Sequence, residues 1–210
     1  MYAADVVFPA LLDRVLYRHP FNGARARRYA TAARPAFDGL DDRLLDALPL
    51  ATTRRLLDLG AGPGTFGARA VARQPGLQVI AVEPSEAFPC TLRAAGEALP
   101  IAESVIDVAI CLSSIRHVRD RAATLRELRR VVRPGGRLVI VELDPAADAR
   151  RIATHTRRLG SPMLRWVFGP LIVRTAPPAA AIEAIAISAG WQPRGLRDDP
   201  EQPVYVMELA

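Results

Sequence analysis

The sequence predicts a doubly wound α/β fold, in which helices cover both faces of a mostly parallel sheet. Four short apolar runs have the length and β-branched content of buried parallel strands, and segments with helical periodicity lie between them. A glycine-rich stretch, LDLGAGPGTFG (Leu57–Gly67), directly follows the first of these runs. Strands that alternate with helices in this way form one sheet with right-handed crossovers.

The length and composition predict one domain in a reducing cytoplasm. At 210 residues, half of them apolar and a quarter charged, the chain has the size and balance of a single globular unit, residues 1–210. No apolar run approaches the length of a membrane span, and the first residues carry Asp5 without a basic leader. The two cysteines, Cys90 and Cys111, are too few to predict a disulfide framework or a metal site.

The elements can be assigned in chain order. Residues 1–54 predict two or three helical pieces, broken near Pro20, Pro35 and Pro49, that lie across the sheet edge or over a ligand. Residues 55–143 hold the predicted strands Arg55–Leu59, Leu77–Val82, Val105–Leu112 and Arg137–Leu143, with helices Thr65–Arg73 and Ala122–Arg133 between them. Pro134-Gly135-Gly136 is expected to end the second helix and turn the chain into the next strand.

The last third of the chain begins with a segment too long for a plain connection. Residues 144–178 include MLRWVFGPLIV (Met163–Val173), an apolar and aromatic run that precedes the C-terminal helix. Residues 179–210 then predict helix Ala179–Ala189, a turn at Gly190 and a strand near Trp191–Leu196. A final strand is expected over Val204–Leu209.

The net charge of +6 raises the question of nucleic-acid binding. The sequence contains no lysine, and its arginines occur in most segments, often beside acids, as in Arg126-Glu127 and Arg197-Asp198. This distribution favours a solvated arginine-rich surface over a nucleic-acid patch. RNA remains the alternative partner.

The glycine loop has two interpretations. Gly62, Gly64 and Gly67 have the G-x-G-x-x-G spacing of a dinucleotide site. Asp58, however, would repel a pyrophosphate and would suit a ligand with an ammonium group, and Pro63 removes one backbone donor from a phosphate cradle. Glu83 ends the second strand, where a carboxylate can accept from ribose hydroxyls in either interpretation.

Five sequence motifs together decide between the two interpretations of the glycine loop. They are LLDLGAGPG (Leu56–Gly64), VEPS (Val82–Ser85), GEALP (Gly96–Pro100), IDVAICLSSIRHV (Ile106–Val118) and LRELRRVVRPGGRLVIVE (Leu125–Glu142). In order and position, these motifs resemble those of the class I S-adenosylmethionine-dependent methyltransferases, and most closely those of the ubiquinone/menaquinone-biosynthesis type. The resemblance is strong over residues 56–142 and loose beyond them. It implies a Rossmann-like sheet of seven strands, with the last strand, Val204–Leu209, antiparallel between strands five and six.

The resemblance also implies S-adenosylmethionine as cofactor, S-adenosylhomocysteine as product, and a role for each matching residue. Asp58 would order the loop and reach toward the methionine ammonium, while the backbone of Gly60, Ala61, Gly62 and Gly64 lies against the cofactor. Glu83 would take the ribose hydroxyls, with Pro84 and Ser85 beside the adenine, Glu97 and Ala98 along its edge, and Cys111, Leu112 and Ser113 flanking the methionine.

Two departures from the family pattern stand out. Ala95 occupies the place of an aspartate that accepts from the adenine amino group in many relatives. Between Glu83 and Glu97, where relatives fit a helix and a strand, this chain has only Ser85–Ala95, with Pro89 inside it. One helix is therefore expected to shrink to a turn. The sheet face there would be thinly covered, or covered by the N-terminal segment or by a second subunit in a homodimer.

The acceptor is less well defined than the cofactor. His117, after the fourth strand, is the leading candidate for a general base, with a structural histidine as the alternative. His19 is expected to mark a turn and His155 to lie on a solvated helical face. Asp107, Glu142 and Asp144 do not form an acidic cluster, so no metal is expected.

The resemblance implies that residues 144–178, between the fifth strand and the following helix, form a substrate cap. Its residues Met163, Trp166 and Phe168 favour a small lipophilic or aromatic acceptor, methylated at oxygen, nitrogen or carbon. Ordinary packing or a dimer contact would produce the same composition. Two other functions stay open: a non-catalytic module that keeps the fold, and an RNA methyltransferase.

Overall fold

The computed structural model describes residues 39–159 and 162–210. The helical pieces predicted near Pro20 and Pro35, and the turn predicted at His19, lie outside the described residues.

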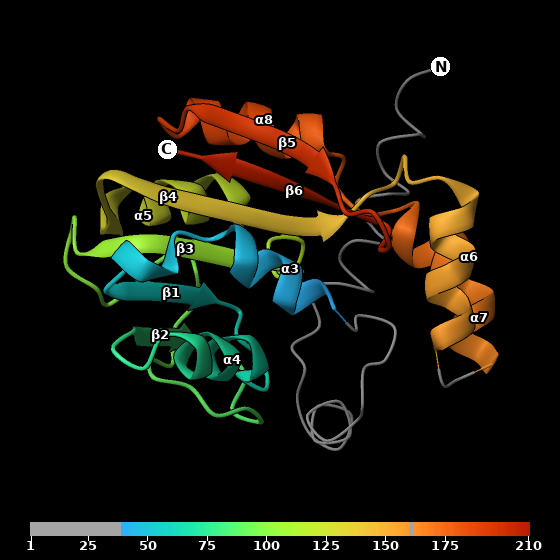
Figure 1. The fold of residues 1–210 in the computed structure, drawn as a ribbon. Coiled ribbons are helices and arrows are strands. Elements are labelled where there is room, and N and C mark those ends of the chain that lie inside the picture. Colours follow the sequence, from blue (N-terminus) through green and yellow to red (C-terminus); the bar gives the residue numbers. More distant parts are fainter. Residues whose placement is uncertain (1–38, 160–161) are drawn as a thin grey trace.

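Six strands form one twisted sheet in the order β2-β1-β3-β4-β6-β5 (Figure 1). Their bounds are β1 Arg55–Leu59, β2 Gln78–Val82, β3 Ile106–Leu112, β4 Val132–Leu143, β5 Pro193–Asp198 and β6 Val204–Leu209. The first four strands are parallel, and β6 runs antiparallel to both of its neighbours, β4 and β5. This arrangement confirms the doubly wound α/β prediction and the place of the antiparallel last strand.

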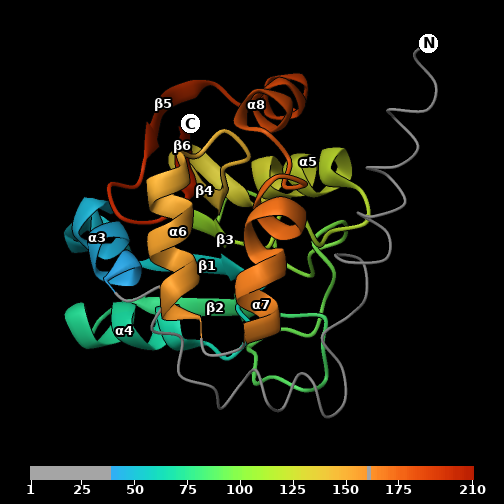
Figure 2. The ribbon, with the colours of Figure 1, turned by 90° about the vertical axis from the view of Figure 1, so that its right-hand side faces the viewer.

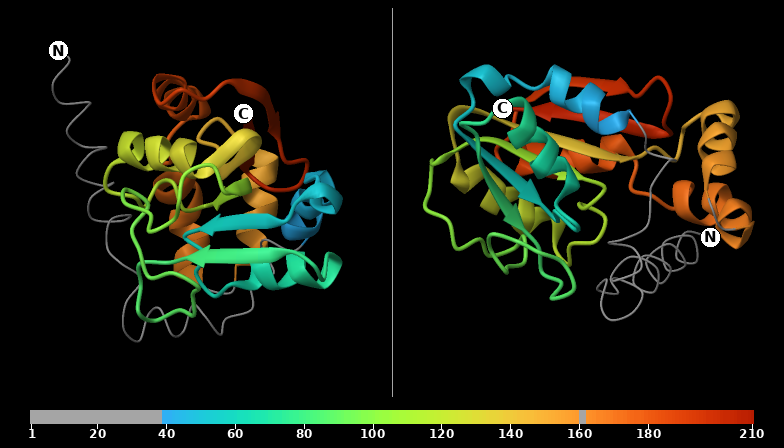
Figure 3. Two further views of the ribbon diagram at one scale, coloured as in Figure 1. Left: turned by 90° about the vertical axis from the view of Figure 1, so that its left-hand side faces the viewer. Right: turned by 60° about the horizontal axis from the view of Figure 1, so that its bottom comes forward.

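Helices cover the two faces of the sheet, and successive residues of a strand pack against helices on opposite faces. Leu57 of β1 packs in a core with α5 (Arg121–Val131) and α8 (Ala179–Ser188). Its neighbour Leu56 packs on the opposite face with α3 (Leu40–Ala47) and α4 (Thr65–Arg73). A short 3₁₀ turn, η3 (Leu50–Thr52), leads from α3 into β1. Figure 3 shows α3 and α4 on one side of the strands and α5 and α8 on the other.

The sheet has six strands in the described residues, one fewer than the seven predicted. The missing strand belongs beyond β2, where a single parallel bridge joins Val82 to Leu92. There the backbone N–H groups of Thr91 and Leu92 both donate to Ala81 O, at 2.9 and 3.0 Å. The residues between β2 and Glu97 are too few for a helix and a full strand, so only one bridge of that strand persists.

The Pro134-Gly135-Gly136 stretch also differs from its prediction. α5 ends at Val131 and β4 begins at once at Val132, so these residues lie inside the strand. Ile106 pairs with Val132 but Val108 already pairs with Arg137, which makes the stretch an irregular bulge. A Cβ on Gly136 would lie 2.8 Å from Asp107 O, so the close approach of the two strands requires a glycine there.

The cap, residues 144–178, is helical and lies beyond the carboxyl ends of the parallel strands (Figures 1 and 2). It comprises α6 (Ala149–Arg158), α7 (Pro162–Val167) and the π-helical η4 (Phe168–Val173). The loop between β5 and β6 holds α6 in place. Arg151 donates to Asp198 Oδ2 at 2.8 Å and to Asp199 O at 3.1 Å, and His155 Nδ1 lies 2.6 Å from Gln202 Oε1.

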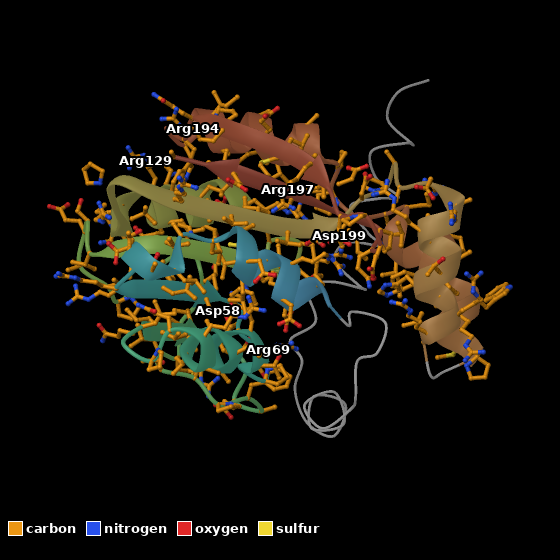
Figure 4. The ribbon with its side chains drawn as sticks, in the orientation of Figure 1. Asp58, Arg69, Arg129, Arg194, Arg197 and Asp199 are labelled. Atoms are coloured by element: carbon orange, nitrogen blue, oxygen red, sulfur yellow. The ribbon has the colours of Figure 1, made fainter. Side chains whose placement is uncertain are left out.

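Asp199 in the same loop also binds α3, because Arg43 donates to both of its carboxylate oxygens at 2.8 and 2.9 Å. Figure 4 shows Asp199 between the sheet and the cap. None of the helices in the described residues has the length and apolarity needed to cross a membrane.

Candidate active site

A buried carboxylate lies at the carboxyl end of β1. Asp58 is only 2% exposed, and no described residue donates a hydrogen bond to it. Burial, together with the nearby charges of Asp41 and Glu83, raises the pKa of Asp58 to about 7. A carboxylate without a partner in an acidic surrounding is suited to a cationic ligand. Figure 4 places it between β1 and α4.

The glycine loop passes over this end of β1. Gly60 and Ala61 both donate to Val82 O, at 2.8 and 3.2 Å, which ties the loop to the end of β2. Gly60 has φ +73°, and a Cβ there would lie 2.5 Å from the Cβ of Ser114, so only glycine fits where the loops after β1 and β3 meet. Gly62 and Gly64 also have positive φ, but a Cβ on either would meet no atom within 4 Å. Among the described residues, nothing blocks a ligand from approaching the backbone on this side of the two glycines.

Glu83 joins the loops that follow β1 and β2. Its Oε2 accepts from Gly62 N at 2.9 Å, and its Oε1 accepts from Ser85 N at 2.8 Å. Ser85 is buried beside it, whereas Pro84 is exposed. The carboxylate is thus fixed at the rim of the glycine loop, where each oxygen retains a lone pair for a further donor.

The predicted adenine-edge stretch packs against the start of α5. Glu97 Oε1 accepts from Arg119 N at 2.7 Å and from Asp120 N at 2.9 Å. A Cβ on the preceding Gly96 would lie within 3.3 Å of Leu59 and of Thr124, so the stretch lies at the same sheet edge as the glycine loop. Ala98 is exposed.

The residues after β3 differ in what they can present to a ligand. Cys111 is fully buried, and burial raises the pKa of its thiol to about 12, so only its backbone can reach a ligand. Leu112 and Ser113 are half-buried. Ser113 has φ +52°, and its N–H donates to Val141 O at 2.8 Å. His117 is half-buried in the following turn, where its backbone N–H donates to Ser114 O at 2.9 Å.

One pair of functional interest escaped the sequence reasoning. Arg116 and Glu142 are 3% and 0% exposed, and Arg116 Nε donates to Glu142 Oε1 at 2.8 Å, with Nη2 bonded to the same oxygen. Leu143 N donates to that oxygen too, at 2.7 Å. The pair fixes the turn that carries His117 to the end of β4. The signal for it was a glutamate near the end of an apolar strand, β4, and an arginine in the turn that follows another, β3.

The three predicted cap residues do not surround one space. Phe168 is 5% exposed and stacks on the ring of His155, at 4.3 Å between centroids. Met163 and Trp166 on α7 point outward, at 71% and 80% exposed. The expectation for His155 was wrong: it is 1% exposed, because it packs between Phe168 and Gln202, and burial lowers its pKa.

Metal-binding side chains are not grouped at this edge. Within residues 39–159 and 162–210, no three His, Cys, Asp or Glu side chains are close enough together to hold a metal ion. The structure instead brings together Asp58, the open glycines and Glu83. This set offers an anionic, hydrogen-bonding and sterically open cradle, which fits a ligand that carries an ammonium group and a ribose.

Comparisons with known proteins agree with this geometry. Residues 57–140 match a family model described as a methyltransferase domain. A demethylmenaquinone methyltransferase from Mycolicibacterium paratuberculosis is 30% identical over 165 residues, which cover 69% of this chain and 70% of that protein. An uncharacterized 37.1 kDa protein in transposon TN4556 of Streptomyces fradiae is 39% identical over 162 residues, which cover 70% of this chain and 46% of that protein.

A solved structure shows the same fold. A SAM-dependent methyltransferase from Aquifex aeolicus superposes with a TM-score of 0.68 at 13% identity, over 89% of this chain and 96% of that one. The chain belongs to the class I S-adenosylmethionine-dependent methyltransferases. Within that class it is of the ubiquinone/menaquinone-biosynthesis type, and S-adenosylmethionine is its cofactor. The chain spans less than half the length of the transposon protein.

Proposed function

We propose that this domain methylates a small lipophilic aromatic acceptor of the quinol class, at a ring carbon. The observation that carries the proposal is the buried carboxylate of Asp58, which accepts no hydrogen bond from a described residue, next to a glycine loop where Gly62 and Gly64 have no described atom against them. The acceptor class is supported by the demethylmenaquinone methyltransferase that covers most of this chain.

In this proposal the chain's own residues hold the cofactor in three places. Asp58 pairs with the methionine ammonium, the backbone of Gly60, Ala61, Gly62 and Gly64 contacts the methionine and ribose, and Glu83 accepts from the ribose hydroxyls. Pro84, Ser85, Glu97 and Ala98 border the adenine, and the backbone of Cys111, Leu112 and Ser113 flanks the methionine. S-adenosylmethionine supplies a methyl group activated by a positively charged sulfur.

The chemistry that remains for the protein is alignment and proton removal. Bound S-adenosylmethionine would supply the methyl group and would leave as S-adenosylhomocysteine, and the quinol ring carbon that takes the methyl group would lose a proton. His117 is the proposed base for that proton or for a quinol hydroxyl. The buried Arg116–Glu142 pair holds the turn of His117 in position.

The direct test is methyl transfer from isotopically labelled S-adenosylmethionine to a reduced demethylnaphthoquinol with a short isoprenoid tail, followed by mass spectrometry. We expect a product heavier by one labelled methyl group, formed more slowly by His117→Gln, with kcat reduced about 100-fold and little change in KM. Transfer to none of a panel of quinols, phenols and amines, although the cofactor binds, would refute the proposal.

That last outcome describes the second candidate, a non-catalytic partner module. The specific observation that favours it is the loss of one strand and of the aspartate position at Ala95 beside the adenine edge. RNA methylation is less well supported, because many arginines of the body are neutralised. Arg69 and Arg73 pair with Asp42, Arg130 with Glu127, and Arg133 with Asp107.

A further inference from the structure

The cap carries an unusual combination of exposed apolar side chains and positive charge. Among the large hydrophobic side chains that are exposed in the described residues, Trp166 and Met163 are the most exposed, at 80% and 71%. The next, Ile187 on α8, is 53% exposed. Trp166 and Met163 are three residues apart on α7, so they project from one side of that helix.

The cap that carries this apolar side is also rich in arginine. Residues 144–178 contain six arginines and two aspartates, so this sixth of the chain holds four of its six net positive charges. Arg150, Arg157, Arg165 and Arg174 are exposed and form no ion pair with any described residue. The other two described cap arginines, Arg151 and Arg158, do pair with acids. Ion pairs with acids are also formed outside the cap by Arg43, Arg69, Arg73, Arg130 and Arg133.

An apolar groove opens on the same part of the molecule. It lies between α6 and η4, has a volume of about 550 Å³, and has Ile152, Gly169 and Pro170 on its walls. Arg157 and Arg174 stand at its border. Figures 1 and 2 show α6 and α7 at the outer end of the molecule, in front of the carboxyl ends of the strands.

We propose that the cap docks on an anionic lipid bilayer, with Trp166 and Met163 inserted at the headgroup level and the unpaired arginines on the lipid phosphates. Tryptophan partitions to the interface between water and hydrocarbon, and each arginine near an anionic surface adds attraction. The proposal extends the proposed function, because a lipophilic acceptor resides in such a bilayer. The purpose of membrane docking, which is access to that acceptor, rests on the proposed function, whereas docking itself does not.

Two other occupants fit the observations less well. A second copy of the chain would bring two faces of like charge together, which disfavours a symmetric contact. Single-stranded nucleic acid is held by stacking on several aromatic rings, whereas the exposed apolar pair on α7 has one aromatic member and one aliphatic member.

The test uses the full chain and two kinds of extruded vesicle: phosphatidylcholine alone, and phosphatidylcholine with about one third phosphatidylglycerol. We expect the protein to sediment with the anionic vesicles only, and to be released by high salt. The chain has two tryptophans, and Trp191 is 2% exposed with its indole N–H bonded to Leu125 O. Trp166 is therefore the tryptophan whose fluorescence should respond to vesicles. We expect its emission to shift to the blue and its quenching by acrylamide to decrease on binding.

Matched variants locate the surface. We expect Trp166→Ala and the double variant Arg157→Gln/Arg165→Gln each to weaken vesicle binding about tenfold. Ile187→Ser, and Arg194→Gln/Arg197→Gln on β5 (Figure 4), should leave it unchanged. Absence of vesicle binding, equal binding to both vesicles, or equal loss in the β5 variant would overturn the proposal. So would cap-dependent binding to RNA or cap-dependent dimerisation without binding to vesicles.

A cofactor titration of the Arg157→Gln/Arg165→Gln variant separates the two proposals. It should bind S-adenosylhomocysteine as the wild type does, because these arginines lie outside the cradle. If the wild type itself fails to bind the cofactor, the methyl-transfer proposal fails while the vesicle result is unaffected.

Discussion

At the scale of single residues, the ionised carboxylate of Asp58 destabilises the fold but suits the binding of a cationic ligand. Its carboxylate is buried without a donor among the described residues, and its pKa of about 7 means that the folded chain takes up a proton well above the usual range of an aspartate. Without ligand, the ionised form is therefore unfavourable in the fold. A cationic ligand removes that disadvantage, which couples the charge of Asp58 to occupancy of the site.

The sign of the pH dependence follows. Because the pKa of Asp58 in the fold is raised above the ordinary aspartate value of 3.8, stability falls as pH rises from 3.8 through about 7. Asp58→Asn removes this titration, so without cofactor it should melt about 3–8 °C above the wild type at pH 8 and not at pH 5. Thermal melts at the two pH values measure this.

Asp107→Asn is the matched control at the opposite end of the sheet. Burial raises the pKa of Asp107, but hydrogen bonds from Arg133 and from the backbone of Arg55 and Arg54 outweigh it and hold the pKa low. Its stabilisation is present above the unfolded pKa and lost as pH falls, so this variant should melt below the wild type at pH 8. If both variants lost stability at pH 8, the raised pKa of Asp58 would be wrong.

Gly60 and Gly64 illustrate two different reasons why a position requires glycine: a left-handed backbone and a lack of space for a Cβ. Both have left-handed φ, +73° and +78°, but only a Cβ on Gly60 would collide with a neighbour, Ser114. In urea unfolding, Gly64→Ala should cost about 1–2 kcal/mol and Gly60→Ala about 2–5 kcal/mol. Adding Ser114→Gly should restore part of the stability lost in Gly60→Ala and none of that lost in Gly64→Ala. Equal losses at the two glycines would contradict the contact between the loops.

At the scale of elements, the turn after β3 is held to β4 by a buried ion pair. Glu142→Ala leaves the buried Arg116 without this carboxylate and should lower the free energy of unfolding by about 3–5 kcal/mol. Glu208→Ala on β6 is the control, since Glu208 lies 4.0 Å from Arg137 and 3.9 Å from Arg197 at the surface; it should cost less than about 1 kcal/mol. Similar losses in the two variants would show that the buried pair does not stabilise the turn.

The elements also show where sequence reasoning succeeds. β1, α4 and β6 have the predicted bounds, because each is a clear apolar or amphipathic pattern between turn residues. The strand beyond β2 was expected from the family pattern, yet too few residues remain there to form it. The Pro134–Gly136 stretch has the composition of a turn, and only the pairing with β3 shows that it is a bulge.

At the scale of the whole molecule, local motifs predicted which residues lie together around the glycine loop better than they predicted the arrangement of the cap. Asp58, the glycines and Glu83 lie close together in sequence around two neighbouring strands, so their spacing already implies their juxtaposition. The Arg116–Glu142 pair, and the contact of His155 with Gln202, join segments far apart in the chain. No periodicity in the sequence specifies such contacts, and the outward direction of Trp166 depends on how the cap packs.

The charge of the molecule is likewise a property of the assembled fold. The excess of arginine is spread along the sequence, but folding pairs only some of these arginines with acids, such as Arg43, Arg69 and Arg130. In the cap, Arg151 and Arg158 are paired, whereas Arg150, Arg157, Arg165 and Arg174 form no ion pair with any described residue. Figure 2 shows the cap helices α6 and α7 in front of the strands.

The central claim is that the Asp58 cradle holds S-adenosylmethionine, and calorimetric titration tests it most directly. We predict that the wild type binds S-adenosylmethionine and S-adenosylhomocysteine at one site, with affinity that weakens as pH falls below about 7. Asp58→Asn should remain folded and bind about a hundredfold more weakly. Absence of binding by the wild type, or unchanged affinity in Asp58→Asn, would contradict the account.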